Sequence, residues 1–121
     1  MKKLLVVALA FVLLLFAPSE IKEPVPPTVP AESVQQYAKR LAVAKWSTVE
    51  WHCLHILWHR ESRWNHKAKN PRSSARGIPQ MLKMDPRTPA KRQVQLGIKY
   101  VSHRYDTPCE ALSHHFRRGW Y

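Results

Sequence analysis

The sequence predicts an all-α domain, and three observations lead to this prediction. Apolar residues recur at helical spacing in three stretches, 32–45, 47–61 and 88–105. A threonine followed by proline signals the start of a fourth helix over 108–116. No stretch alternates apolar and polar residues with a period of two, so no strand is predicted. The 121 residues leave room for one domain.

The first 19 residues have the layout of a secretory signal peptide. A charged start at 1–3 precedes an apolar run over 4–16, and Ala17-Pro18-Ser19 supplies small residues for a signal peptidase. The alternative is an uncleaved membrane anchor, but the run is short against the roughly 20 residues that span a bilayer. We therefore expect a secreted protein that keeps no stable membrane span after cleavage.

The chain after this segment is strongly basic. Removing Lys2 and Lys3 leaves 18 basic and 8 acidic residues, a net charge of +10. Such a charge favours polyanionic surroundings. An export signal argues against nucleic acid, so anionic polymers of a bacterial cell wall are the expected surroundings.

Residues 20–31 are predicted to be a linker, and residues 32–121 the folded domain. Four prolines in the linker favour polyproline geometry and forbid a regular helix. The domain then opens with the helix over 32–45. Its apolar residues at helical spacing are Val34, Tyr37, Leu41 and Ala44.

The helix over 47–61 has the clearest start, a capping box in which Ser47 is the N-cap and Glu50 returns to its amide. At 100° per residue, one broad arc of this helix is apolar and carries Glu61 at its middle. The members of the arc are Val49, Trp51, Cys53, Leu54, Leu57, Trp58 and Glu61.

Three histidines lie opposite that arc: His52, His55 and His59. Their spacing could ligate zinc from one helix face. A further acid on that face is missing, so we expect a solvated polar face and neither a metal nor another cofactor.

The next part of the domain is an irregular segment over 65–87, rich in Asn, Pro, Ser, Lys and Arg. Thr88 is the predicted N-cap of the following helix. The inner stripe of that helix is expected to be Val94, Ile98, Val101 and Tyr105. Thr107 and Glu110 are predicted to form a second capping box, with Pro108 at the first helical position.

Two cysteines, Cys53 and Cys109, occur in this chain. An even count in an exported protein predicts one disulfide, and two buried free thiols are the alternative. The disulfide would close a loop of about 57 residues and stabilise the fold by about 4 kcal/mol in the chain-entropy model.

Glu61 is the candidate catalytic residue. Apolar surroundings disfavour the charged form of a carboxyl and raise its pKa, which keeps it protonated for general-acid work. The alternative is a half-exposed glutamate that is paired with Arg60 or Arg63.

Two motifs favour the acid. Glu61-Ser62-Arg63-Trp64-Asn65 resembles the catalytic Glu-Ser-x-aromatic-Asn element of the lytic transglycosylases of the goose-lysozyme-like fold. Gly77-Ile78-Pro79-Gln80 is similar to their Gly-x-x-Gln element. The segments 95–105, 108–111 and 119–121 look like those of a small secreted, aggregation-promoting-factor-like subgroup from Gram-positive bacteria and their phages. The resemblance covers residues 46–121.

The resemblance implies a small lysozyme-like domain that cleaves the β-1,4 bond between N-acetylmuramic acid and N-acetylglucosamine in peptidoglycan. Glu61 would act as acid and then as base, giving 1,6-anhydro-muramyl ends. The implied substrate-binding residues are Ser62, Gly77, Ile78, Gln80, Tyr105, His114, Trp120 and Tyr121. The expected partners are glycan strands and anionic wall polymers, and the expected state is a monomer.

This chain departs from the family pattern in three places. The segment between Gln80 and Thr88 is short, Ser113-His114 stands where many relatives carry an aromatic-Asn pair, and Arg76 precedes the Gly-x-x-Gln element. Two alternatives therefore stay open, a hydrolytic muramidase and a non-catalytic cationic wall-binding module on the same fold.

Overall fold

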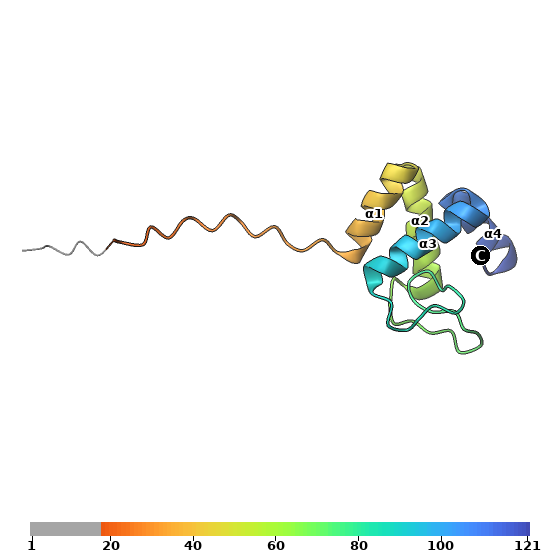
Figure 1. Cartoon of the computed structure of the whole chain (residues 1–121). Helices are drawn as coiled ribbons and strands as arrows, with labels where there is room; N and C mark the ends of the chain where they lie inside the picture. The colour runs from red at the N-terminus through yellow and green to blue at the C-terminus, as the bar shows by residue number, and fades with distance from the viewer. Residues whose placement is uncertain (1–17) are drawn as a thin grey trace, which may run out of the picture. The chain divides into compact units, whose positions relative to one another are not determined.

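A computed structural model describes residues 18–121, so almost all of the predicted signal peptide at 1–19 lies outside the described residues. Residues 18–30 contain neither helix nor strand, and Ala31–Tyr121 form one compact unit (Figure 1). Within the described part of the chain, no helix combines the length and the apolar character that crossing a membrane requires.

Four helices make up the compact unit: α1 (Val34–Lys45), α2 (Thr48–Ser62), α3 (Ala90–Tyr105) and α4 (Pro108–Arg118). The all-α prediction is therefore confirmed. Across residues 18–121 the extended pairing amounts to two isolated antiparallel bridges, which Arg76 makes with its neighbours in the loop.

The helices pack in a closed circuit (Figure 1). α2 packs against α1 and α4, and α3 packs against the same two helices. The indole of Trp58 fills the space between α2 and α3, because a Cβ at Gly97 would lie 2.5 Å from Cζ2 of Trp58. The core residues are Ala38, Ala42, Trp51, Leu54, Leu57, Trp58, Ile78, Val94, Ile98, Val101, Ala111 and Leu112.

The apolar arc of α2 is narrower than predicted. Trp51, Leu54, Leu57 and Trp58 are buried, whereas Val49 is 67% exposed. Val49 lies in the first turn of the helix, where it remains largely open to solvent. The side of α2 that carries Glu61 nevertheless faces inward, as predicted.

The predicted N-caps Ser47 and Thr107 are correct, but neither helix start has the return bond of the predicted capping box. The side chain of Ser47 accepts from the amide of Glu50, and that of Thr107 accepts from the amide of Glu110. Glu50 does not return to its own helix start, however. Its Oε2 accepts from the amide of Cys109 at 2.8 Å and so ties α2 to the first turn of α4.

The predicted start of α3 is wrong by one residue. The N-cap is Pro89, which has no side-chain cap, and the hydroxyl of Thr88 donates to the carbonyl of Asp85 at 2.7 Å. The Thr88 hydroxyl therefore bonds within the turn at Asp85 and does not act as the predicted N-cap of α3.

Cys53 and Cys109 form a disulfide, as predicted. It joins α2 to α4 beside the contact between Glu50 and the Cys109 amide. A disulfide is consistent with an extracytoplasmic location, where the environment is oxidising.

The polar face of α2 is only partly solvated, contrary to the prediction. His52 and His59 are exposed, but His55 is partly covered. The His55 ring lies 5.4 Å from the Trp51 ring and 5.7 Å from the Trp64 ring, and its Nε2 lies 3.2 Å from Oε1 of Gln35. α1 and the segment after α2 therefore cover this part of the face.

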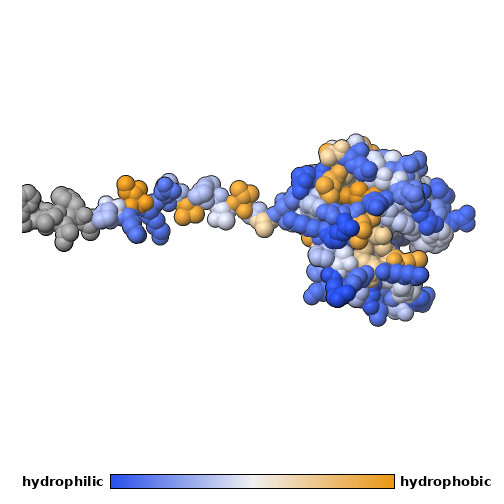
Figure 2. Space-filling model, viewed as in Figure 1, coloured by the Kyte–Doolittle hydropathy of each residue, from blue (hydrophilic) through white to orange (hydrophobic). Residues whose placement is uncertain are grey.

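The segment between α2 and α3 is irregular, as predicted, and is held by its own backbone. The amide of Gly77 donates to Ala68 O, and Arg76 and Met81 exchange two hydrogen bonds. The side of the compact unit seen in Figure 2 is largely hydrophilic, with an interrupted band of hydrophobic residues.

Candidate active site

Glu61 lies in the last turn of α2, where the helix packs against α4. Its side chain is only 15% exposed. Burial raises the pKa of this carboxyl to about 7, and the positive charge of Arg60 opposes the rise. Near neutral pH, Glu61 therefore exists as both acid and conjugate base, which suits a group that must give and take a proton.

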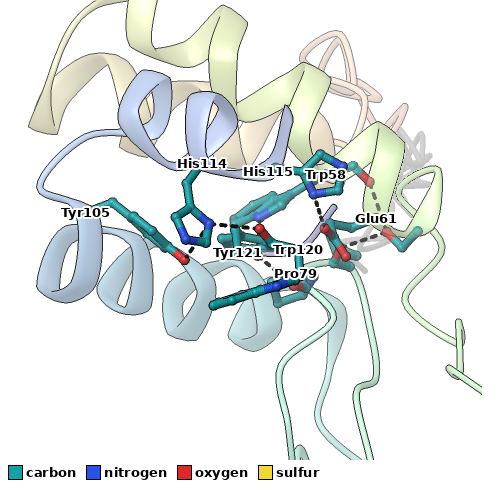
Figure 3. Close-up of polar contacts among 10 residues, drawn as sticks. Trp58, Glu61, Pro79, Tyr105, His114, His115, Trp120 and Tyr121 are labelled. Carbon is teal, nitrogen blue, oxygen red and sulfur yellow. Dashed lines mark hydrogen bonds and ion pairs between the residues drawn. The ribbon is translucent and has the colours of Figure 1, made fainter. Parts of the chain in front are cut away.

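The polar side chain that meets Glu61 is His115 of α4, rather than the Arg60 or Arg63 that the sequence offered. Nδ1 of His115 lies 3.0 Å from Oε1 of Glu61 (Figure 3). Burial lowers the pKa of His115, and the charges of Arg60 and His114 lower it further. Both members of the pair are thus shifted toward their neutral forms.

Tyr121 and Trp58 form a hydrogen-bonded chain beside the carboxyl (Figure 3). Nε1 of Trp58 donates to the Tyr121 hydroxyl at 3.0 Å, and that hydroxyl donates to the carbonyl of Pro79 at 2.6 Å. Burial raises the pKa of Tyr121 well above its usual value, and the charge of Glu61 raises it further. The phenol therefore stays protonated and joins α2 to the turn at 77–80.

Ser62 makes the second link between α2 and that turn. Its hydroxyl donates to the carbonyl of Ile78 at 2.7 Å and lies 3.2 Å from the carbonyl of Trp58. Ile78 itself is fully buried. In this structure Ser62 and Ile78 hold the turn against the helix that carries Glu61.

Gly77 has no room for a side chain. Its φ is +79°, and a Cβ there would lie 2.4 Å from Oε1 of Gln93. Gln93 is 2% exposed, accepts from the amide of Ile78, and donates to the carbonyls of His66 and Thr88. This buried amide, which the sequence pattern did not single out, fixes the turn from α3.

Gln80 has a φ of +52°, and its side-chain nitrogen turns back into the loop. Nε2 donates to the carbonyl of Gly77 at 3.0 Å and to that of Ala68 at 3.3 Å. The residue also lines a surface hollow. The side-chain oxygen is the part of the amide left for a ligand.

Tyr105, His114 and Trp120 form a second group (Figure 3). Nδ1 of His114 lies 2.9 Å from the carbonyl of Trp120 and 3.5 Å from the hydroxyl of Tyr105. A carbonyl only accepts, so Nδ1 of His114 carries the proton. The His114 ring also meets the Trp120 ring edge-on at 4.6 Å, and Arg104 lies 5.4 Å above that indole.

Two of the hollows that adjoin these groups are lined by neighbours of the carboxyl, and neither is lined by Glu61 itself. The first, of about 260 Å³, is lined by Gln80, Met81, Leu82, Tyr100, Arg104, Trp120 and Tyr121. The second, of about 300 Å³, is lined by His59, Arg60, Arg63 and His115. Tyr121 borders the first hollow and His115 the second, so the neighbours of the carboxyl reach both.

Sequence reasoning selected His114 and missed His115. A signal was present, because His115 follows Ala111 by four residues and Leu112 by three, and both are buried. Helical spacing therefore puts His115 on the inward stripe of α4. Neighbouring residues on a helix point about 100° apart, which separates the two histidines.

Comparison with known proteins gave no match. Neither a family model, nor a curated protein, nor a solved structure is significantly similar to this chain. The site must therefore be judged on its own geometry.

Proposed function

We propose that the protein is a peptidoglycan lytic transglycosylase with a lysozyme-like domain and with Glu61 as general acid and base. The observation that carries the proposal is a buried carboxyl whose pKa is raised to about 7, at a helix end that Ser62 joins to the Gly-Ile-Pro-Gln turn. A disulfide and a basic surface are in keeping with work outside the cytoplasm, on anionic wall material.

The proposed reaction needs one carboxyl. Protonated Glu61 gives its proton to the oxygen between C1 of N-acetylmuramic acid and O4 of N-acetylglucosamine, and the C1–O4 bond breaks. The acetamido group of the muramyl sugar stabilises the positive charge that develops at C1. The muramyl 6-hydroxyl then forms the C1–O6 bond and returns its proton to Glu61, so no water is consumed.

Three of the five other acids of the compact unit have different roles. Asp85 pairs with Arg87 on the surface, Glu32 pairs with Arg40, and Glu50 caps α4. Glycosidases that retain or invert configuration through two carboxyls need a second acid facing the bond. The engagement of these acids elsewhere favours the single-carboxyl reaction.

The decisive test is Glu61→Gln, with Glu32→Gln as the matched control because Glu32 is an acid that pairs with Arg40 of α1. General acid–base catalysis contributes about 10²- to 10⁴-fold, so Glu61→Gln should lose at least about 100-fold in wall cleavage while Glu32→Gln keeps it. Cleavage by Glu61→Gln within about tenfold of wild type would assign the acid to another group.

Mass spectrometry of the products separates the transglycosylase from a hydrolytic muramidase. Transglycosylation gives anhydro-muramyl ends that are one water lighter than the reducing ends left by hydrolysis. Reducing ends alone would replace the proposed reaction with hydrolysis at the same residue.

The second candidate is a non-catalytic cationic wall-binding module. It is favoured because His115 lies against Glu61 and because Glu61 lines neither hollow. If wild type and Glu61→Gln both sediment with wall material and neither releases fragments, this candidate stands.

A further inference from the structure

The contact between His115 and Glu61 contains a buried nitrogen that the fold leaves unsatisfied. The His115 side chain is 11% exposed, and across residues 18–121 its Nδ1 is a buried side-chain nitrogen without a hydrogen-bond partner. It nevertheless lies 3.0 Å from Oε1 of Glu61. Leaving a buried polar atom unpaired is costly, so its position against the candidate acid calls for an explanation.

The surroundings of the ring decide which nitrogen carries the proton. Burial, Arg60 and His114 all favour the neutral imidazole, which has one N–H. The ring borders the hollow lined by His59, Arg60 and Arg63. Guanidinium groups only donate hydrogen bonds, so the nitrogen nearer them is best left without a proton. Nδ1 is the buried nitrogen and faces a carboxyl oxygen, which accepts hydrogen bonds, so Nδ1 carries the proton and Nε2 does not.

The charged and titratable groups around the pair come from α2, from α4 and from the residues after α4. His59, Arg60 and Arg63 lie at the end of α2, His114 lies on α4, and Tyr121 follows α4. Arg60 disfavours a second proton on His115 and favours the ionised form of Glu61. A neutral donor is therefore the form of His115 that fits both states of Glu61.

We infer that His115 is a positioning residue for the proposed reaction, in which Nδ1–H donates to Oε1 of Glu61 and leaves Oε2 to exchange the proton with the substrate. The inference rests on the proposed function for its purpose, although the contact itself does not. The two atoms lie 3.0 Å apart without a hydrogen bond between them, so the inferred bond requires a reorientation of the carboxyl or of the ring. Fixing one oxygen holds the other in a single orientation, and orientation contributes strongly to proton-transfer rates.

The first test uses the unaltered protein. Nitrogen-15 NMR of the histidine side chains between pH 6 and 8 distinguishes the two neutral tautomers of His115. We expect a protonated Nδ1 and an unprotonated Nε2. The opposite tautomer, or a ring that is charged throughout this range, would overturn the inference.

The second test compares His115→Asn with His115→Phe. Asparagine places an amide N–H near the position of Nδ1, whereas phenylalanine keeps the ring shape without a donor. A donor stabilises the ionised carboxyl, so in His115→Phe the carbon-13 titration midpoint of the Glu61 carboxyl should rise by about one to two pH units. In His115→Asn it should stay near that of wild type, as it should in the control His52→Asn, which alters an exposed histidine.

The kinetic readout is a split between kcat and KM. His115→Phe should lose about 10- to 100-fold in kcat with little change in KM, and His115→Asn should recover most of the loss. An unchanged or lowered Glu61 midpoint in His115→Phe overturns the positioning role whatever the activity. If His115→Phe does not fold, the tautomer of wild type decides.

The two proposals fail separately. Full cleavage by Glu61→Gln would overturn the proposed function and, with it, the purpose assigned to His115. The tautomer and the carboxyl titration would still report the contact, because neither measurement depends on activity.

Discussion

His114 and His115 are adjacent on α4 and have opposite surroundings. Nδ1 of His114 is satisfied by the carbonyl of Trp120, and its ring packs against Trp120 and Tyr105. Nδ1 of His115 has no hydrogen bond and faces a carboxyl whose pKa is raised. The comparison teaches that α4 contributes to two sites. His114 has its hydrogen bond satisfied and orders the aromatic residues, whereas His115 has an unsatisfied nitrogen beside the candidate acid.

The largest change in stability is expected from removing the disulfide, which anchors the helix that carries both His114 and His115. The Cys53–Cys109 bond holds the start of α4 to α2 across a sequence separation of 56. Replacing both cysteines by serine should lower the free energy of unfolding by about 4 kcal/mol, measured by chemical denaturation. Because α4 carries both histidines, their contacts should weaken together.

Thiol titration of the denatured, unreduced protein is the control for that experiment. Wild type should show no reactive thiol. Two reactive thiols would contradict the disulfide.

The pH dependence of the stability of Glu61→Gln tests the surroundings of the carboxyl that His115 faces. The pKa of Glu61 is about 7 in the folded protein against 4.5 as the reference value, so between these values the folded state binds more protons than the unfolded state. Wild type therefore loses stability through Glu61 as pH rises from about 4.5 to 7, by about 3 kcal/mol at most. Glutamine does not titrate.

We therefore expect the stability of Glu61→Gln relative to wild type to increase across that pH window and to level off above it. Chemical denaturation at several pH values measures the difference, and His115 is present in both proteins. A difference that stays constant from pH 4 to 8 would contradict a raised pKa.

Gln80→Ala tests the turn at 77–80, where Gln80 lines the same hollow as Trp120. The substitution leaves the carbonyls of Gly77 and Ala68 without this donor, which should lower the free energy of unfolding by about 1–2 kcal/mol. If Gln80 also contacts the sugar, kcat/KM of the folded fraction should fall further. Intact activity with a lower melting temperature would limit Gln80 to a structural role.

His114→Ala should have the smallest effect and tests whether the two groups are separate. The variant loses one hydrogen bond to the Trp120 carbonyl and the packing of two rings, at a cost of about 1 kcal/mol. Tryptophan fluorescence should report a freer Trp120, while the Glu61 titration midpoint moves little. A shift as large as that in His115→Phe would mean that the histidines act as one network.

Much of the fold could be predicted because it depends on local signals. Helical spacing and the N-caps Ser47 and Thr107 depend on residues within one or two turns, so the four helices were predicted to within a few residues at their ends. The start of α3 was misplaced because Thr88 had a competing partner in Asp85. That competition depends on how the preceding turn folds.

The sequence by itself determined the four helices, the inward position of Glu61 and the pairing of its two cysteines. Only the tertiary structure decided the partners of these groups: His115 for Glu61, Gln93 for the turn at 77–80, and the Cys109 amide for Glu50. The physical reason is that periodicity tells which face of a helix is buried, whereas the atom that meets a buried group comes from another helix, whose rotation and height are set by packing. Trp58 filling the space left by Gly97 is one such packing contact, and no local pattern encodes it.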